Sequence, residues 1–176
     1  MDKILELFIK NPEKEFHVRG ISKLVGKSPT TVSKYLKKLA SDNILLLEKK
    51  FNHLLFRANV ENKKYKREKL KYNLDLLNES GLVKFLEDQF NQPEAIVLFG
   101  SFAKAENGSK SDIDILVISP TEKEANLEKY EKILGFPIQL FVNSRKNIEK
   151  MKDKNKGLLN NFINGHVLSG RWEIFR

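Results

Sequence analysis

The stretch LFGSFAKAENGSKSDIDILV, residues 98–117, decides the fold of the second half of the chain. It holds a Gly-Ser pair at 100–101, a polar loop, and two aspartates, Asp112 and Asp114, separated by one isoleucine. Successive side chains of a strand point to opposite faces, so both carboxylates lie on one face if this segment is extended. Like charges held this close repel each other, and a positive group is therefore expected beside them.

From residue 94 onward, strand-like and helix-like segments alternate, which is typical of an α/β unit. The turn at Gly100 and Ser101 leads from a strand into a helix and leaves backbone N–H groups free, and such a turn attracts phosphate. The serine hydroxyl adds another donor. Strands are predicted over 94–100, 112–119 and 136–143, and helices over 101–106, 122–134 and 160–170.

The first 60 residues contain three short amphipathic segments followed by two strand-like runs. Ser28 and Pro29 suit the N-cap and the first position of the third helix. This order resembles a winged helix-turn-helix, and the resemblance implies binding of double-stranded DNA. The predicted helices cover 1–11, 20–26 and 27–43, and the predicted strands cover 44–50 and 54–60, with the hairpin tip at 51–53.

The third predicted helix exposes small hydroxyls and lysines, which can reach base edges and phosphates in a major groove. The hairpin adds further cations and polar groups at Asn52, His53 and Arg57. The alternative is a packing or dimerisation module whose basic face is only solvated. The candidate DNA-binding residues are Thr30, Thr31, Ser33, Lys34, Lys37, Lys38, Lys49 and Lys50.

The charge of the chain is unevenly distributed. The net charge is +9, and residues 1–72 hold 18 basic against 8 acidic residues, whereas residues 73–176 hold 14 against 15. All the excess positive charge therefore lies in the first part, which favours a polyanionic partner there. Lysine-rich composition alone also suits an ordinary solvated surface.

Composition limits the remaining classes of function. The 176 residues include no cysteine, which excludes disulfides, thiolate zinc sites and cysteine nucleophiles. No apolar run reaches the roughly 18 residues of a membrane span, and the charged N-terminus does not resemble a signal peptide. We therefore expect a cytoplasmic α+β protein without membrane association. The predicted domains are 1–60, a helical connector over 61–91, and 92–176.

Gly100-Ser101, ten intervening residues and then Asp112-Ile113-Asp114 resemble the signature of the DNA polymerase β-like nucleotidyltransferase superfamily. More narrowly, they resemble the minimal nucleotidyltransferases of prokaryotes, and residues 163–175 are similar to the tail of archaeal members. The resemblance implies a small fold with a mixed sheet. It also implies that Gly100 and Ser101 bind the triphosphate of an NTP, ATP being expected, and that Asp112 and Asp114 are catalytic ligands of Mg²⁺ or Mn²⁺.

One position departs from this family pattern. The third carboxylate of the family usually lies on the next strand, where this chain has Gln139. A neutral amide cannot act as a general base and is a poor substitute for an anionic metal ligand. Three functions stay open: a DNA-associated nucleotidyltransferase with an unidentified acceptor, a transcriptional regulator that only senses a nucleotide, and an antitoxin that modifies a toxin partner. A homodimer also stays open.

Overall fold

The computed structural model describes residues 2–50, 52–121 and 123–173. They form two compact units, residues 1–72 and 73–176. Helix α4 (Lys63–Ser80) contains the boundary, so its first part belongs to one unit and its last part to the other. None of the helices in the described ranges has the length and apolarity needed to cross a bilayer.

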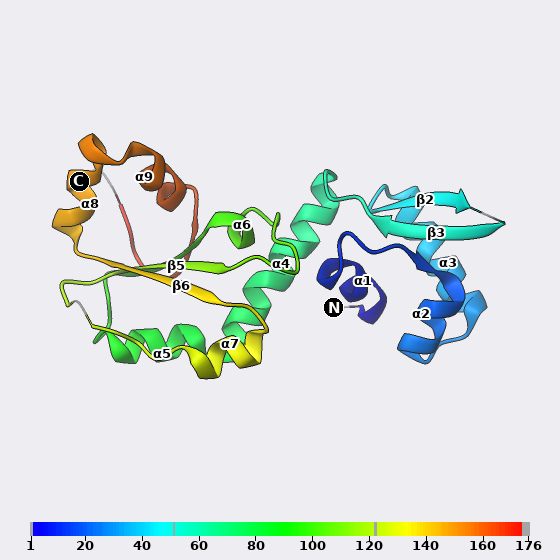
Figure 1. Ribbon diagram of the computed structural model, residues 1–176, viewed down its shortest axis with the longest axis horizontal. Helices are drawn as coiled ribbons and strands as arrows, with labels where there is room; N and C mark the ends of the chain where they lie inside the picture. The colour runs from blue at the N-terminus through cyan, green and yellow to red at the C-terminus, as the bar shows by residue number, and fades with distance from the viewer. Residues whose placement is uncertain (1, 51, 122, 174–176) are drawn as a thin grey trace. The chain divides into compact units, whose positions relative to one another are not determined.

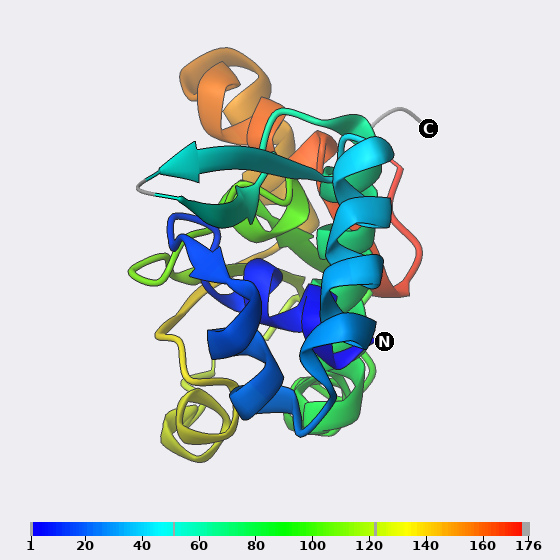
Figure 2. The ribbon, with the colours of Figure 1, turned by 90° about the vertical axis from the view of Figure 1, so that its right-hand side faces the viewer.

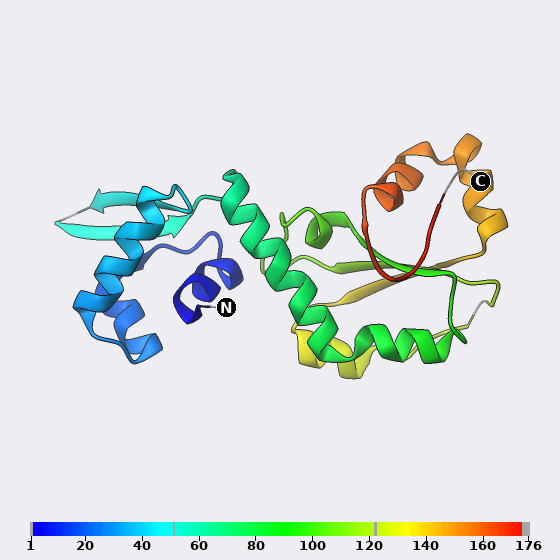
Figure 3. The same cartoon turned by 180° about the vertical axis from the view of Figure 1, so that it is seen from behind.

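The first unit consists of short helices and a small antiparallel sheet in the strand order β1-β3-β2. The predicted helices and hairpin strands are present, whereas β1 was not expected. Residue 51 of the predicted hairpin tip lies outside the described residues, and the two strands of the hairpin extend past the helices of this unit (Figure 3). The elements before α4 are α1 (Lys3–Lys10), β1 (Phe16–His17), α2 (Val18–Val25), α3 (Pro29–Ser41), β2 (Leu45–Lys50) and β3 (His53–Ala58).

Helix α3 begins as its sequence predicts. The Ser28 hydroxyl accepts a hydrogen bond from the backbone N–H of Thr31 at 3.2 Å, and Pro29 occupies the first helical position. Val32, Leu36 and Leu39 form the buried stripe of the helix. The opposite face of α3 is polar and exposed, and Figure 2 shows the helix and the hairpin in side view.

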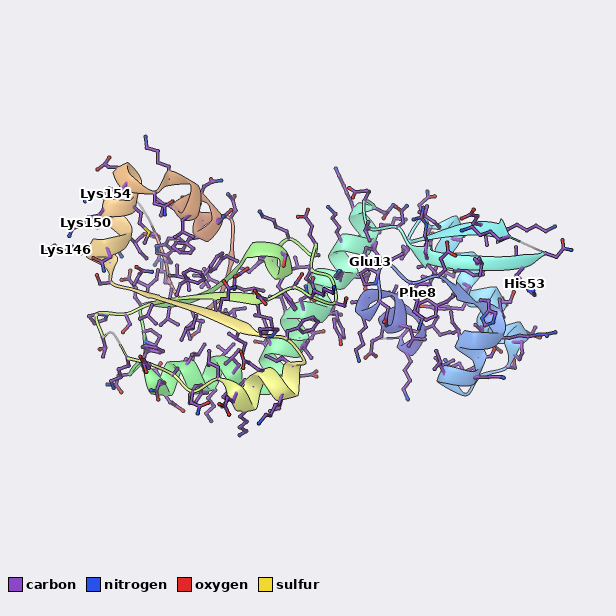
Figure 4. The ribbon with its side chains drawn as sticks, in the orientation of Figure 1. Phe8, Glu13, His53, Lys146, Lys150 and Lys154 are labelled. Carbon is purple, nitrogen blue, oxygen red and sulfur yellow. The ribbon has the colours of Figure 1, made fainter. Side chains whose placement is uncertain are left out.

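The core of the first unit includes the beginning of α4. Phe8 is fully buried, stacks edge-on against Phe16 at 5.0 Å between ring centroids, and lies among the side chains of this unit (Figure 4). The hydroxyl of Tyr65, on α4, donates a hydrogen bond to the backbone oxygen of Phe8 at 3.2 Å, and burial raises the pKa of Tyr65. Residues 61–72 thus pack with the first unit, although the sequence predicts a connector over 61–91.

The second unit is built around a four-stranded sheet in the order β6-β5-β4-β7. Strands β5 and β6 are parallel, whereas β4 is antiparallel to both β5 and β7. The mixed sheet that the sequence predicts is confirmed. Its elements are α5 (Leu82–Gln89), β4 (Ala95–Phe99), α6 (Gly100–Ala103), β5 (Ile113–Ile118), α7 (Glu128–Leu134), β6 (Ile138–Asn143), α8 (Arg145–Lys154), α9 (Lys156–Ile163) and β7 (His166–Gly170).

The sheet is covered on both faces. Helices α5 and α7 lie on one face and α8 and α9 on the other (Figure 1). Ile113, Ile115 and Val117 of β5 pack in the core on the α5 and α7 side, whereas Leu116 and Ile118 pack with α8 and α9. By alternation, Asp114 shares the face of Leu116 and Ile118.

The C-terminal segment differs from its prediction. The prediction of a helix over 160–170 is wrong, because α9 ends at Ile163. The chain then enters strand β7, which pairs with β4. Gly165 lies at this turn, where a larger residue would not fit, because a Cβ at that position would lie 2.5 Å from the backbone oxygen of Leu98. Helix α8 was not expected. Ile148 is the buried residue of this helix, and Lys146, Lys150 and Lys154 point outward (Figure 4). Because a single buried apolar residue makes no repeating pattern, the sequence of α8 gives only a weak helix signal.

Tyr65→Phe tests whether α4 belongs to the first core. The variant loses one buried hydrogen bond while keeping the ring, so the free energy of unfolding of the first unit should fall by about 1 kcal/mol. Urea unfolding, followed by circular dichroism of the full chain, measures this loss. Tyr35→Phe is the matched control, because the described residues offer the Tyr35 hydroxyl no hydrogen-bond partner. Equal losses in both variants would contradict the assignment.

Candidate functional site

Strand pairing brings the motif residues together at one end of the second sheet. Phe99, the last residue of β4, pairs with Asp114 on β5, and Asp114 pairs on its other side with Gln139 on β6. Asp112 lies just before β5, and its Oδ2 atom accepts a hydrogen bond from Gln139 Nε2 at 2.7 Å. Gly100, the two aspartates and Gln139 therefore surround one site.

Gly100 is required at this site both by conformation and by space. Its φ of +70° lies in the left-handed region, which favours glycine. A Cβ at position 100 would overlap the carboxylate of Asp114. The backbone at the start of α6 thus touches the carboxylate directly, and Ser101 follows, half-buried, at the same end of the sheet.

The two carboxylates are held in an unfavourable environment. Burial and, secondarily, the charge of Asp112 raise the pKa of Asp114. No lysine or arginine of the described residues forms an ion pair with Asp112 or Asp114. The positive group that is expected beside the two carboxylates is therefore not one of these side chains. Two adjacent carboxylates suit a hard divalent cation such as Mg²⁺ or Mn²⁺.

A third acid does not join the pair. Within residues 2–50, 52–121 and 123–173, no cluster of three or more acidic, histidine or cysteine side chains could hold a metal ion. Glu131 accepts a hydrogen bond from the backbone N–H of Ile138 at 2.9 Å, and Glu94, before β4, is paired with Arg145. Both acids are therefore engaged elsewhere, and Gln139 occupies the place beside Asp112.

The first unit contains a broad basic groove of about 620 Å³ between α2 and α3. Four predicted DNA-binding residues line it: Thr30, Ser33, Lys34 and Lys37. Arg19 also lines it and was missed by sequence reasoning, because the second helix was expected to begin at residue 20, whereas α2 begins at Val18. In the described part of the chain, no acidic side chain pairs with Arg19, Lys34 or Lys37.

The other predicted DNA-binding residues lie outside this groove. Thr31 Oγ1 is hydrogen-bonded to Ser28 Oγ at 2.9 Å, as part of the cap of α3. Lys38 and Lys49 are exposed. Lys50 is paired with Glu15 at 2.9 Å and with Glu48 at 3.2 Å, and the hydrogen bond that Lys50 donates to Glu15 raises the pKa of Lys50. Its charge is thus partly neutralised.

Comparison with known families agrees with the geometry of the second unit. Residues 79–162 match the family described as "Nucleotidyltransferase domain", which belongs to the polymerase β-like superfamily. The matched segment contains Gly100, Ser101, both aspartates and Gln139. The match supports nucleotidyl transfer at the level of that family, whose domains generally use an NTP and a divalent metal. No curated protein and no solved structure matched the chain.

Asp114→Asn should stabilise the metal-free protein at neutral pH. Because the pKa of Asp114 is raised in the fold, the native state binds more protons than the unfolded state at pH values above the usual aspartate pKa of about 3.9. Wild-type stability therefore falls as the pH rises through this window. The variant escapes that loss, so its melting temperature should exceed that of wild type at pH 7, and the gap should narrow toward pH 3.

Calorimetric melts in buffer with a chelator, from pH 3 to pH 8, measure this gap. Asp153→Asn, at an exposed position of α8, is the matched control and should leave the melting temperature nearly unchanged. An Asp114→Asn protein that melts below wild type at pH 7 would contradict the electrostatic account of the site.

Proposed function

We propose that this chain is a DNA-associated nucleotidyltransferase. Its second unit binds an NTP with a divalent cation and transfers the nucleotidyl group to an acceptor, and its first unit holds duplex DNA. One observation carries the catalytic part: Asp114 lies against Gly100 with the charge of Asp112 beside it, and no cationic side chain of the described residues balances the two carboxylates. Such a pair is costly to a fold unless a cation binds there.

The proposed reaction gives each group one task. Asp112 and Asp114 hold the cation, while the backbone N–H groups around Gly100 and the hydroxyl of Ser101 bind the triphosphate. A bound divalent cation supplies charge neutralisation at the α-phosphate. The acceptor oxygen bonds to the α-phosphorus, the bond to the bridging oxygen breaks, and pyrophosphate leaves with the electron pair. Gln139 cannot take the acceptor proton, so another group or the solvent must receive it.

A second candidate function follows from the hydrogen bond between Gln139 and Asp112. The amide occupies one oxygen of a proposed metal ligand and stands where the family has an acid. A site of this kind can bind NTP and cation without transferring the nucleotide. The protein would then be a DNA-binding regulator that responds to a nucleotide.

Gln139→Glu separates these two functions. Glutamate has nearly the size of glutamine and places a third carboxylate beside Asp112, which completes the ligand set and offers a base. We incubate wild type and variant with each labelled NTP, Mg²⁺ and cell extract, and measure pyrophosphate release and labelled product. Wild-type transfer that disappears in Asp112→Asn supports the enzyme. An inactive wild type that binds ATP, with transfer gained by Gln139→Glu, supports the regulator.

Absence of magnesium-dependent NTP binding by wild type in calorimetry at millimolar concentrations would sink both candidate functions of the second unit. Gln139→Leu serves as the control for Gln139→Glu, because it removes the amide without adding a carboxylate. Gain of transfer in both variants would mean that loss of the amide, rather than the new acid, restores activity.

The groove between α2 and α3 supports the proposed DNA association. It combines three cations, Arg19, Lys34 and Lys37, with the hydroxyls of Thr30 and Ser33. Cations suit the phosphate backbone, and hydroxyls suit either phosphates or base edges. The resemblance of this unit to a winged helix-turn-helix points the same way.

Lys34→Ala and Lys37→Ala should each weaken binding of any duplex sequence. Each variant removes one phosphate contact, so the slope of log affinity against log salt should become shallower by about 0.9. Fluorescence anisotropy of the full chain with a labelled duplex measures both effects. Lys146→Ala and Lys150→Ala, exposed lysines of the second unit (Figure 4), are the matched controls. Equal losses in these controls would show only a general charge effect.

A further inference from the structure

Helix α6 is too short to satisfy its own carbonyl groups. It has four residues, and the backbone N–H of Lys104 donates to the oxygen of Gly100 at 3.2 Å. The later carbonyls need donors from outside the helix. The backbone N–H groups of Glu106 and Ala105 donate to the oxygens of Ser101 at 2.9 Å and Phe102 at 3.3 Å. The oxygens of Phe102 and Ala103 also receive side-chain donors from distant segments.

Asn73, on α4, supplies the first of these donors. Its side chain is 1% exposed, and its amide Nδ2 donates to the backbone oxygen of Phe102 and to Oδ1 of Asn107, both at 2.9 Å. Asn107 is itself buried and lies in the loop that leads from α6 to Asp112. One amide group thus ties down both the helix after Gly100 and the loop before the aspartates.

His166, on β7, supplies the second donor. It pairs across the sheet with Leu98 on β4, and its Nε2 lies 3.2 Å from the backbone oxygen of Ala103. A carbonyl oxygen can only accept, so Nε2 carries the proton in this contact. The end of α6 is therefore held from β7 as well as from α4.

We infer that Asn73 and His166 are positioning residues of the nucleotidyl-transfer site, an inference that rests on the proposed function of the second unit. Neither side chain is hydrogen-bonded to Asp112 or Asp114. Both act through α6, whose first residue, Gly100, touches the carboxylate of Asp114. If α6 loosens, Gly100 and Ser101 lose their fixed places beside the aspartates, and nucleotide binding weakens although all proposed ligands remain.

The test compares shape with hydrogen-bonding capacity. His166→Phe keeps a ring but has no donor, whereas His166→Gln places an amide nitrogen at nearly the same distance from the backbone as Nε2 of histidine. Asn73→Leu keeps the branching and the number of heavy atoms and removes both donors. Calorimetry of the full chain with ATP and Mg²⁺ should show affinity weakened about tenfold in His166→Phe and Asn73→Leu, the effect of about one buried hydrogen bond. His166→Gln should recover most of it.

A second measurement needs no nucleotide. The backbone amides of Lys104 and Glu106 are bonded to the oxygens of Gly100 and Ser101, so their hydrogen exchange reports the opening of α6. Their exchange should speed up about tenfold in His166→Phe and Asn73→Leu and stay near wild type in His166→Gln. Ser169→Ala and Ser80→Ala are controls on the same strand and helix, since these hydroxyls bond Glu87 and the oxygen of Leu77 instead.

The outcomes separate the inference from the proposed function. Unchanged exchange in both His166→Phe and Asn73→Leu overturns the inference, whatever wild type binds. Faster exchange with unchanged ATP affinity also overturns it, because the contacts are then purely structural. Faster exchange with weaker affinity, absent from both serine controls, supports it. A wild type that binds no nucleotide refutes the proposed function and, with it, the positioning role, even where exchange shows that the two side chains clamp α6.

Discussion

The contact between the Gly100 backbone and the Asp114 carboxylate is the constraint on which the second unit depends. It follows from the register of β4 and β5, which sets Phe99 opposite Asp114. A side chain at position 100 would occupy the space of the carboxylate, so glycine, register and aspartate fix one another. The parallel pairing of β5 with β6 then brings Gln139 to the same end of the sheet.

The site combines a face of packed aromatic rings with the unbalanced negative charge of two carboxylates. Phe99, Phe141 and Phe162 pack edge to face on the side of the sheet that carries Asp114, with centroids of Phe99 and Phe162 4.8 Å apart. These rings pack β4, β6 and α9 together on that face of the sheet. The unfavourable burial of negative charge raises the pKa of Asp114. The amide of Gln139 donates a hydrogen bond to only one oxygen of Asp112.

The sequence allows prediction of those features that arise from adjacent residues. The cap at Ser28 and Pro29 is encoded locally, and so is the turn at Gly100 from an apolar strand into helix α6. The aspartate pair is recognisable because one intervening residue decides its geometry. Even the position of Gln139 follows from the strand pattern, since it is a single polar residue inside the apolar run 138–142.

Other features could not be predicted because their causes lie far apart in the chain. Asn73 and His166 reach acceptors 29 and 63 residues away, and nothing beside them in the sequence distinguishes them from solvated polar residues. Helix α8 lacked a strong apolar stripe, and the strand at His166–Gly170 was mistaken for the end of a helix. Arg19 joins the basic groove only through the packing of α2 with α3.

Helix α4 limits how freely such a chain can be assembled from modules. Tyr65 completes the core of the first unit, whereas Asn73 and Leu77 serve the second, and all three belong to one helix. A gene fusion joined at residue 60 would take Tyr65 from Phe8, and one joined at residue 92 would remove Asn73 from α6. A fusion that takes only one of the two units must therefore have its junction inside the helix, near residues 72 and 73. The new partner must then continue the helix across that junction.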